Sequence, residues 1–155
     1  MSRFAFAPMI AGIKLLALAA CALGVASAAS AAEFEVKMRN KGAKGEMVFE
    51  PDVVRIASGD TVHFIVVDRG HAHDAVTIRG MLPEGAEPFI GEPDEDVTVT
   101  FTVPGVYGYK CSPHYSTYGM VGLVIVGDPV NLEEVKKVRQ YGASKKRFAE
   151  IFASL

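Results

Sequence analysis

The stretch Val97-Thr98-Val99-Thr100-Phe101-Thr102-Val103 alternates apolar and polar residues at every position. Successive side chains of a β-strand point to opposite faces of a sheet, so this pattern is typical of a strand with one face in a core. Pro104-Gly105 is a turn signal, and a β-branched and aromatic run follows at residues 106–110. The stretch therefore predicts two consecutive strands joined by a tight turn.

Short runs of the same kind occur on both sides of this stretch. We expect further strands at residues 33–38, 53–56, 61–67, 75–78 and 121–126. Turn signals separate them at Ser58-Gly59-Asp60, Asp68-Arg69-Gly70 and Pro83-Glu84-Gly85. Many short strands with such punctuation predict an all-β fold, a β-sandwich that forms one domain over residues 32–128.

A helical pattern replaces the strand pattern in residues 129–155. Asn131 is placed to cap a helix over residues 132–141, with Glu133 and Glu134 in its first turn. Gly142 would end that helix, and Ser144 would cap a second helix that continues to the C-terminus. Each helix has one apolar face, so we expect both to pack on the sandwich.

Residues 1–31 have the composition of a secretory signal peptide. Positive charges at Arg3 and Lys14 precede an apolar run at 15–25, and Ala29-Ser30-Ala31 fits an A-x-A cleavage site. A mature chain that begins after this site would reside in the periplasm.

Two alternatives for the N-terminus stay open. A retained membrane anchor is disfavoured because the apolar run is too short to span a bilayer. Leu18-Ala19-Ala20-Cys21 resembles a lipobox, which would lead to cleavage before Cys21 and lipidation of that cysteine.

Charge and cysteine content narrow the classes of function. The formal net charge is −2, which does not suggest a nucleic-acid-binding protein. Cys21 leaves with the signal peptide, so Cys111 becomes the single cysteine of an exported chain. A free thiol in an oxidising compartment is a hazard unless it is buried or bound to metal.

A metal explains Cys111 best, because Cys111-Ser112-Pro113-His114 and Met120 place three kinds of donor in one loop. A thiolate, an imidazole and a thioether together suit copper better than zinc or calcium. A type 1 (blue) copper site needs a second imidazole, for which His71 and His73 are the candidates. No open position is needed for substrate, which favours an electron carrier over an enzyme.

The chain from about Phe34 to its end resembles the pseudoazurins, a branch of the cupredoxins. The matching stretches are Asn40-Lys41-Gly42, Met47-Val48-Phe49-Glu50-Pro51, Gly59-Asp60-Thr61-Val62, Gly80-Met81-Leu82-Pro83-Glu84-Gly85-Ala86-Glu87, Pro104-Gly105-Val106-Tyr107, Lys110-Cys111-Ser112-Pro113-His114-Tyr115 and Asn131-Leu132. This resemblance implies a Greek-key cupredoxin sandwich of about eight strands with two C-terminal helices, and one-electron transport.

The resemblance also selects one of the two upstream histidines. In the family three residues separate the first ligand from a T-I-x-x-M motif, and here that motif is Thr77-Ile78-Arg79-Gly80-Met81. The implied ligands of one copper ion cycling between Cu(I) and Cu(II) are therefore His73, Cys111, His114 and Met120. His63 is expected to lie on a sheet face without a metal role.

Two departures from the family pattern concern the metal site. Asp74 stands where the family usually has Asn, so a carboxylate that can accept a hydrogen bond from Ser112 adds negative charge, which would favour Cu(II) and lower the reduction potential. Five residues instead of four separate His114 from Met120. The longer loop would either bulge toward solvent or move the thioether.

The resemblance finally implies how the chain meets a partner. The ring of His114 would reach solvent through an apolar patch that includes Met47, Met81, Pro113 and Tyr115. Cationic side chains around it would steer a redox partner protein, by resemblance a nitrite or nitrous oxide reductase; they are Lys41, Arg69, Lys110, Arg79, Lys136 and Lys137. We expect a monomer, with no membrane contact after the signal peptide is removed.

Three other functions compete with the electron carrier. A copper chaperone or storage protein would want clustered Met or His residues, whereas Met47, Met81 and Met120 are scattered. A copper nitrite reductase would need two such domains. A structural domain without metal is disfavoured because the ligand set is intact.

Overall fold

The computed structural model describes residues 30–155, and all but the last two residues of the expected signal peptide lie outside this part. The strands are β1 (Glu33–Gly42), β2 (Gly45–Glu50), β3 (Val53–Ile56), β4 (Thr61–Val66), β5 (Val76–Thr77), β6 (Val97–Thr100), β7 (Gly105–Lys110) and β8 (Val121–Val126). The helices are α1 (Tyr115–Tyr118), α2 (Leu132–Lys137) and α3 (Ala143–Ala153).

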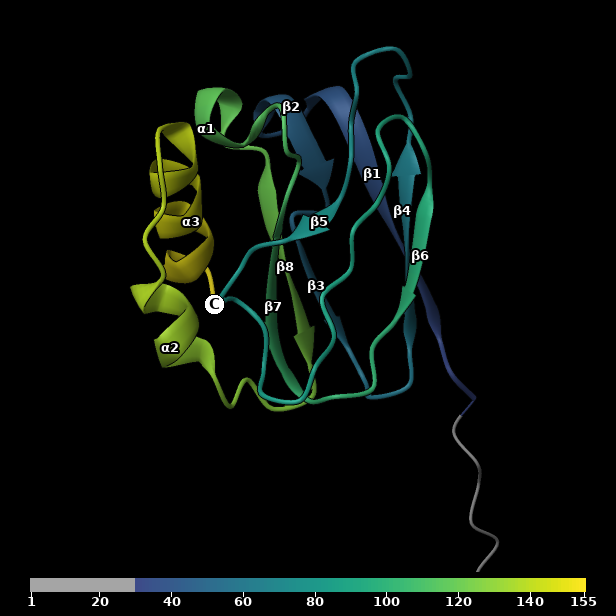
Figure 1. Ribbon diagram of the computed structural model, residues 1–155, viewed down its shortest axis with the longest axis vertical. Coiled ribbons are helices and arrows are strands. Elements are labelled where there is room, and N and C mark those ends of the chain that lie inside the picture. Colours follow the sequence, from purple (N-terminus) through teal and green to yellow (C-terminus); the bar gives the residue numbers. More distant parts are fainter. Residues whose placement is uncertain (1–29) are drawn as a thin grey trace, which may run out of the picture.

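The eight strands form two four-stranded sheets (Figure 1). One has the order β2-β1-β4-β6 and the other β3-β8-β7-β5. β1 pairs with β4, and β3 with β8, in parallel, and the remaining pairs are antiparallel. The expected all-β sandwich with C-terminal helices is confirmed.

Burial along the strands explains their sequence patterns. In β4, Val62, Phe64 and Val66 are buried while the residues between them are half-buried, as expected of a strand with one face in the core. Every residue of β8 is buried. Val124 and Val126 of β8 belong to the core between the sheets, whereas the other face of the strand packs against α2 and α3. Because it is covered on both faces, β8 reads as a continuous apolar run.

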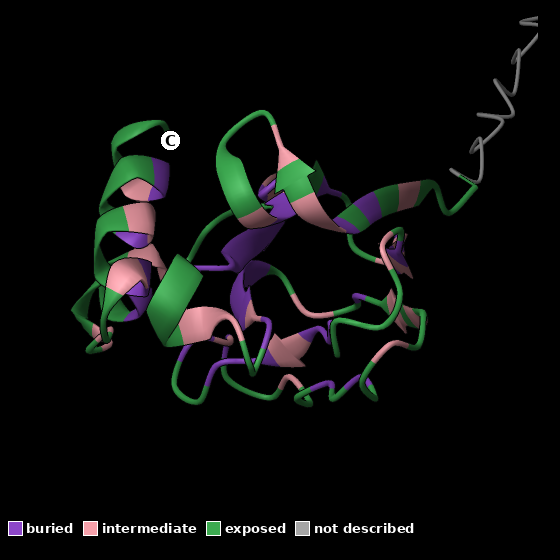
Figure 2. Ribbon diagram, turned by 90° about the horizontal axis from the view of Figure 1, so that it is seen from above, coloured by how far each residue is buried: buried purple, intermediate pink, exposed green. Residues whose placement is uncertain are grey.

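α2 and α3 cover the outer face of the β3-β8-β7-β5 sheet, on the left in Figure 1. The buried side of α3 carries Ser144, Phe148 and Ile151, and Figure 2 shows that this side faces the rest of the molecule. No helix in residues 30–155 has the length and apolarity that a membrane span requires.

The helices differ from the prediction in their bounds and caps. α2 ends at Lys137 rather than Tyr141, because Val138 is extended with φ −65° and ψ 121°. α3 begins at Ala143, so Ser144 lies inside its first turn, where its hydroxyl bonds to the backbone of Tyr141. Asn131 occupies the N-cap position of α2 as predicted, but its side chain makes no capping hydrogen bond. The predicted cap at Ser144 is wrong, because Gly142 occupies the N-cap position of α3.

The side chain of Asn131 joins α2 to β7 instead of making a capping hydrogen bond. Its Oδ1 accepts a hydrogen bond from the backbone N–H of Val106 at 2.7 Å, and its Nδ2 donates to the Val106 carbonyl at 3.0 Å. Val106 is fully buried. The side chain thus satisfies two backbone groups that have no access to water.

We predict that Asn131→Ala lowers the free energy of unfolding by about 2 kcal/mol, because both groups of Val106 lose their partner. Asn131→Asp separates this role from capping, since Asp is as good a cap as Asn but cannot donate to the Val106 carbonyl. Urea denaturation of the metal-free protein measures both variants. An unchanged midpoint for Asn131→Asp would contradict the assigned role.

Candidate metal centre

Three predicted ligands meet at one end of the sandwich. Cys111 directly follows β7, His114 lies three residues further, and His73 lies in the segment between β4 and β5. The Cys111 Sγ is 3.3 Å from Nδ1 of His114 and 3.7 Å from Nδ1 of His73. The three donor atoms lie within 4.8 Å of one another. His73 and Cys111 are fully buried, and His114 is half-buried. One metal ion could bind all three.

Met120 closes the loop that carries two of these residues. It precedes β8, its side chain is fully buried, and its carbonyl accepts a hydrogen bond from the N–H of Cys111 at 3.0 Å. Its own N–H donates to the carbonyl of His114 at 3.2 Å. The backbone thus places Met120 beside both Cys111 and His114.

Four of the five residues between His114 and Met120 form a helical turn, α1, which the sequence did not predict. Gly119 ends the turn in the left-handed conformation, with φ 73°, and its N–H donates to the carbonyl of Tyr115. The turn packs closely on the start of α3, since a Cβ at Gly142 would lie 2.2 Å from the carbonyl oxygen of Ser116. The longer loop is therefore held against α3 rather than bulging freely into solvent.

The ring of His73 is oriented by Asn40 of β1. The Nε2 of His73 lies 2.8 Å from the side-chain oxygen of Asn40, which can only accept. Nε2 therefore carries the proton, and the lone pair is on Nδ1, which faces Cys111. Asn40 lies in a stretch that matches the pseudoazurins, but no sequence pattern indicated its role.

Asp74 ties the two ligand-bearing segments together. Its Oδ1 accepts a hydrogen bond from the backbone N–H of Ser112 at 2.5 Å, and its side chain is buried. The expected acceptance from Ser112 is confirmed. A carboxylate consequently lies next to the cysteine in this chain.

Burial controls the protonation of the metal-free site. Desolvation raises the pKa of the Cys111 thiol to about 12, against the lowering effect of the backbone N–H groups of Asp74 and His114. Desolvation also lowers the pKa values of His73 and His114. His114 and His71 lower the pKa of His73 further, and His71 lowers the pKa of His114 further. The imidazoles are thus neutral and available as ligands, while the thiol must lose its proton when a metal binds.

The other histidines lie outside the cluster. His71 is exposed, and its ring centroid is 6.3 Å from that of His73. His63 lies on β4, where its Nδ1 is 3.0 Å from the hydroxyl of Thr98 on β6. His63 is therefore a sheet-face residue, as expected.

Of the four residues that the resemblance places in an apolar patch around His114, three are accessible to solvent and one is not. Pro113 is exposed and Met47, His114 and Tyr115 are half-buried, but Met81 is fully buried. Met81 packs where Gly108 lacks a side chain: a Cβ there would lie 2.5 Å from its methyl carbon. The patch prediction for Met81 is wrong because its thioether is enclosed between β7 and Gln140, whose Nε2 donates to Sδ at 3.1 Å.

Comparison with known proteins agrees with this donor set. The family model for copper binding proteins of the plastocyanin/azurin family matches residues 36–127. The chain belongs to this family. Within it, the similarity is to pseudoazurins: 46% identity over 135 residues with the pseudoazurin of Paracoccus pantotrophus, covering 86% of this chain and 91% of that protein.

Solved pseudoazurin structures have the same fold. The structure from Methylobacterium extorquens AM1 is 43% identical with a TM-score of 0.74, covering 79% of this chain and 98% of that one. The structure from Sinorhizobium meliloti is 46% identical with a TM-score of 0.70, covering 77% and 96%. Pseudoazurins are copper-binding electron carriers, so the family confirms copper as the cofactor and the expected class of function.

We predict that Gly142→Ala alters the visible spectrum of the copper form. Its Cβ would collide with the backbone of Ser116, so α1 and the adjoining loop must shift. Gly85→Ala is the control: Gly85 also has a positive φ, 78°, but a Cβ there meets nothing within 4 Å. The control should cost about 1–2 kcal/mol of stability and leave the spectrum unchanged. Identical spectra for both variants would refute the link between α3 and the site.

Proposed function

We propose that this pseudoazurin-family chain is a periplasmic one-electron carrier with a type 1 copper site made by His73, Cys111, His114 and Met120. The observation that supports it most is the convergence of one thiol and two imidazole Nδ1 atoms within 4.8 Å in a largely buried site. A His₂Cys plane with a weak axial thioether is the donor set of blue copper.

The protein's part in electron transfer is to keep the ligands fixed. Asn40 holds the ring of His73, Asp74 holds the loop at Ser112, and the Cys111–Met120 hydrogen bond closes that loop. Bound copper supplies the Cu(I)/Cu(II) couple. Because the ligand positions are fixed by the fold, little needs to rearrange when the charge of the site changes, and transfer is fast.

The half-buried His114 is the proposed exit for the electron. Its neighbours Pro113 and Tyr118 are exposed, which gives a small apolar surface of the kind that suits a transient partner. Lys41, Arg69 and Lys110 would steer that partner, and Lys110 lies over the ring of Tyr115 at 5.0 Å. We propose a periplasmic reductase such as nitrite or nitrous oxide reductase as partner, a monomeric carrier, and residues 1–31 as the cleaved signal peptide.

Absorption spectroscopy of copper-loaded variants tests the ligand set. The wild type should show the intense visible band of thiolate-to-copper charge transfer, and Cys111→Ala should abolish it. His73→Ala should lose the band as well, whereas His71→Ala is the matched control and should keep it. A colourless wild-type protein, or loss of the band only in His71→Ala, would refute the proposed site.

The charge of Asp74 gives a further prediction. Asp74→Asn keeps an oxygen that can accept a hydrogen bond from the N–H of Ser112 but removes the negative charge. Because that charge favours Cu(II), its removal should favour Cu(I). We expect the reduction potential to rise by on the order of tens of millivolts, with the visible band retained. Cyclic voltammetry measures this change, and an unchanged or lower potential would show that the carboxylate does not act through its charge.

A further inference from the structure

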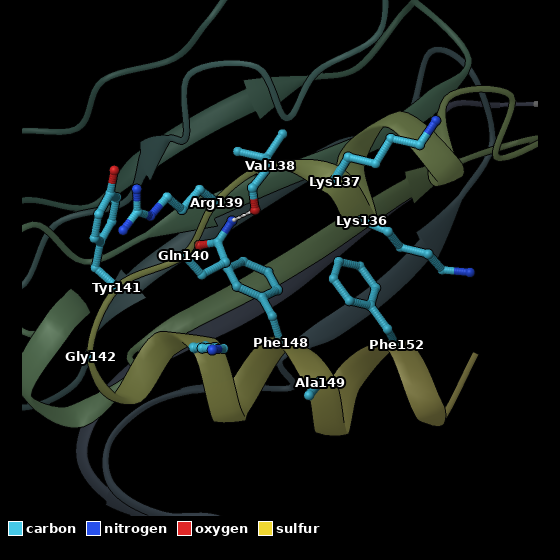
Figure 3. Close-up of a pocket in the computed structure, with 11 residues that line it drawn as sticks. Lys136, Lys137, Val138, Arg139, Gln140, Tyr141, Gly142, Phe148, Ala149 and Phe152 are labelled. Atoms are coloured by element: carbon cyan, nitrogen blue, oxygen red, sulfur yellow. Dashed lines mark hydrogen bonds between the residues drawn. The ribbon is translucent and has the colours of Figure 1, made fainter.

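A groove runs between α3 and the segment that follows α2. It has a volume of about 650 Å³, and Figure 3 shows Phe148 and Phe152 projecting from α3 toward this segment. Val138 and Tyr141 contribute further apolar surface. Phe148 is buried, Val138 and Phe152 are half-buried, and Tyr141 is exposed. An apolar side chain of a partner could therefore bind against these lining residues.

A second hollow of about 650 Å³ continues the groove toward the metal centre. The two share Val138, Arg139 and Tyr141, and the second reaches Lys110 and Tyr115. Tyr115 directly follows His114 in the chain. The groove therefore ends beside the proposed electron exit.

Every charged residue that lines either hollow is a cation. The cations are Lys136, Lys137, Arg139, Lys145, Arg79 and Lys110, and within residues 30–155 no carboxylate lines either hollow. Of these six cations, only Lys136 has an ion-pair partner among residues 30–155, namely Glu133 at 2.8 Å. This concentration of unpaired positive charge stands out in a chain whose formal net charge is −2.

The opposite side of the metal centre is different, because its cations have acidic neighbours. Arg69 donates to the carbonyl of Asp94 and to the carboxylate of Asp96, the latter at 3.3 Å. Lys41 of β1 lies directly across from Glu46 of β2 in the strand register. The charges on this side are therefore largely compensated within the chain.

We propose that the redox partner docks with an acidic segment in the groove along α3, on one side of His114, and that Lys41 and Arg69 act only in steering its approach and lie outside this docking site. This inference rests on the proposed function as an electron carrier. The lining selects the occupant: carboxylates pair with the six cations, and an apolar side chain between them contacts Phe152 and Val138. The partner would then be oriented by the helical side of the molecule while its acceptor faces His114.

A titration monitored by NMR tests the site on the ¹⁵N-labelled, Cu(I)-loaded protein. The probe is a capped synthetic peptide with glutamates on both sides of a central phenylalanine, and its glutamine analogue is the control. At low salt we expect the acidic peptide to shift the amide signals of Val138, Arg139, Tyr141 and Lys145, and the shifts to fade as salt is added. The analogue should bind far more weakly.

Two double variants with the same change in charge separate the two sides. Arg139→Gln/Lys145→Gln should weaken peptide binding about five- to tenfold, and Lys41→Gln/Arg69→Gln less than twofold. Equal losses in the two variants, a glutamine analogue that binds as well, or groove shifts produced by phosphatidylglycerol vesicles or inorganic phosphate but not by the peptide would overturn the proposal. The visible band of each Cu(II) form shows separately whether the copper site, and so the proposed function, is intact.

Discussion

The hydrogen bond from the N–H of Cys111 to the carbonyl of Met120 is the constraint on which the metal centre depends. It extends the pairing of β7 and β8, so the ten residues from Cys111 to Met120 form a closed loop at the end of two central strands. Cys111, His114 and Met120 are thereby brought together by local chain geometry. His73 comes from a distant part of the sequence, and the Asp74–Ser112 hydrogen bond joins its segment to the loop.

The same loop also depends on the C-terminal helices. α3 buries Phe148 and Ile151 against the outer face of β8, which contributes apolar burial of the kind that dominates stability. Its N-terminal end, at Gly142, contacts the backbone of Ser116 in α1. Tyr115 adds a second link, because its hydroxyl hydrogen-bonds to Gln140 at 2.7 Å. The helices therefore both cover the sheet and hold the segment that carries His114.

Sequence patterns predicted the parts of the fold where one physical effect dominates. The alternation in residues 97–103 and the apolar run of β8 each reflect burial, and both strands were found. β2 was missed because Met47, with φ 46°, interrupts the alternation and leaves Val48 and Phe49 consecutively buried. β6 is shorter than the predicted strand at residues 97–103 because it ends at Thr100. The backbone of Phe101 instead hydrogen-bonds to the backbone of Gly59 and Asp60.

The candidate ligands were predicted more completely than the contacts that hold them in place. Donor chemistry identified Cys111, His114 and Met120 from one loop, and the family resemblance chose His73. The helical turn α1, the Asn40–His73 contact and the buried position of Met81 arise from tertiary packing between distant segments, which no local pattern encodes.

The electron paramagnetic resonance spectrum of the Cu(II) form tests the central claim most directly, because it reports the covalency between copper and the Cys111 thiolate. A type 1 site with this thiolate predicts an unusually small copper hyperfine splitting together with the intense visible band. A large hyperfine splitting, as tetragonal nitrogen and oxygen ligation produces, would contradict the proposed ligation by His73, Cys111, His114 and Met120.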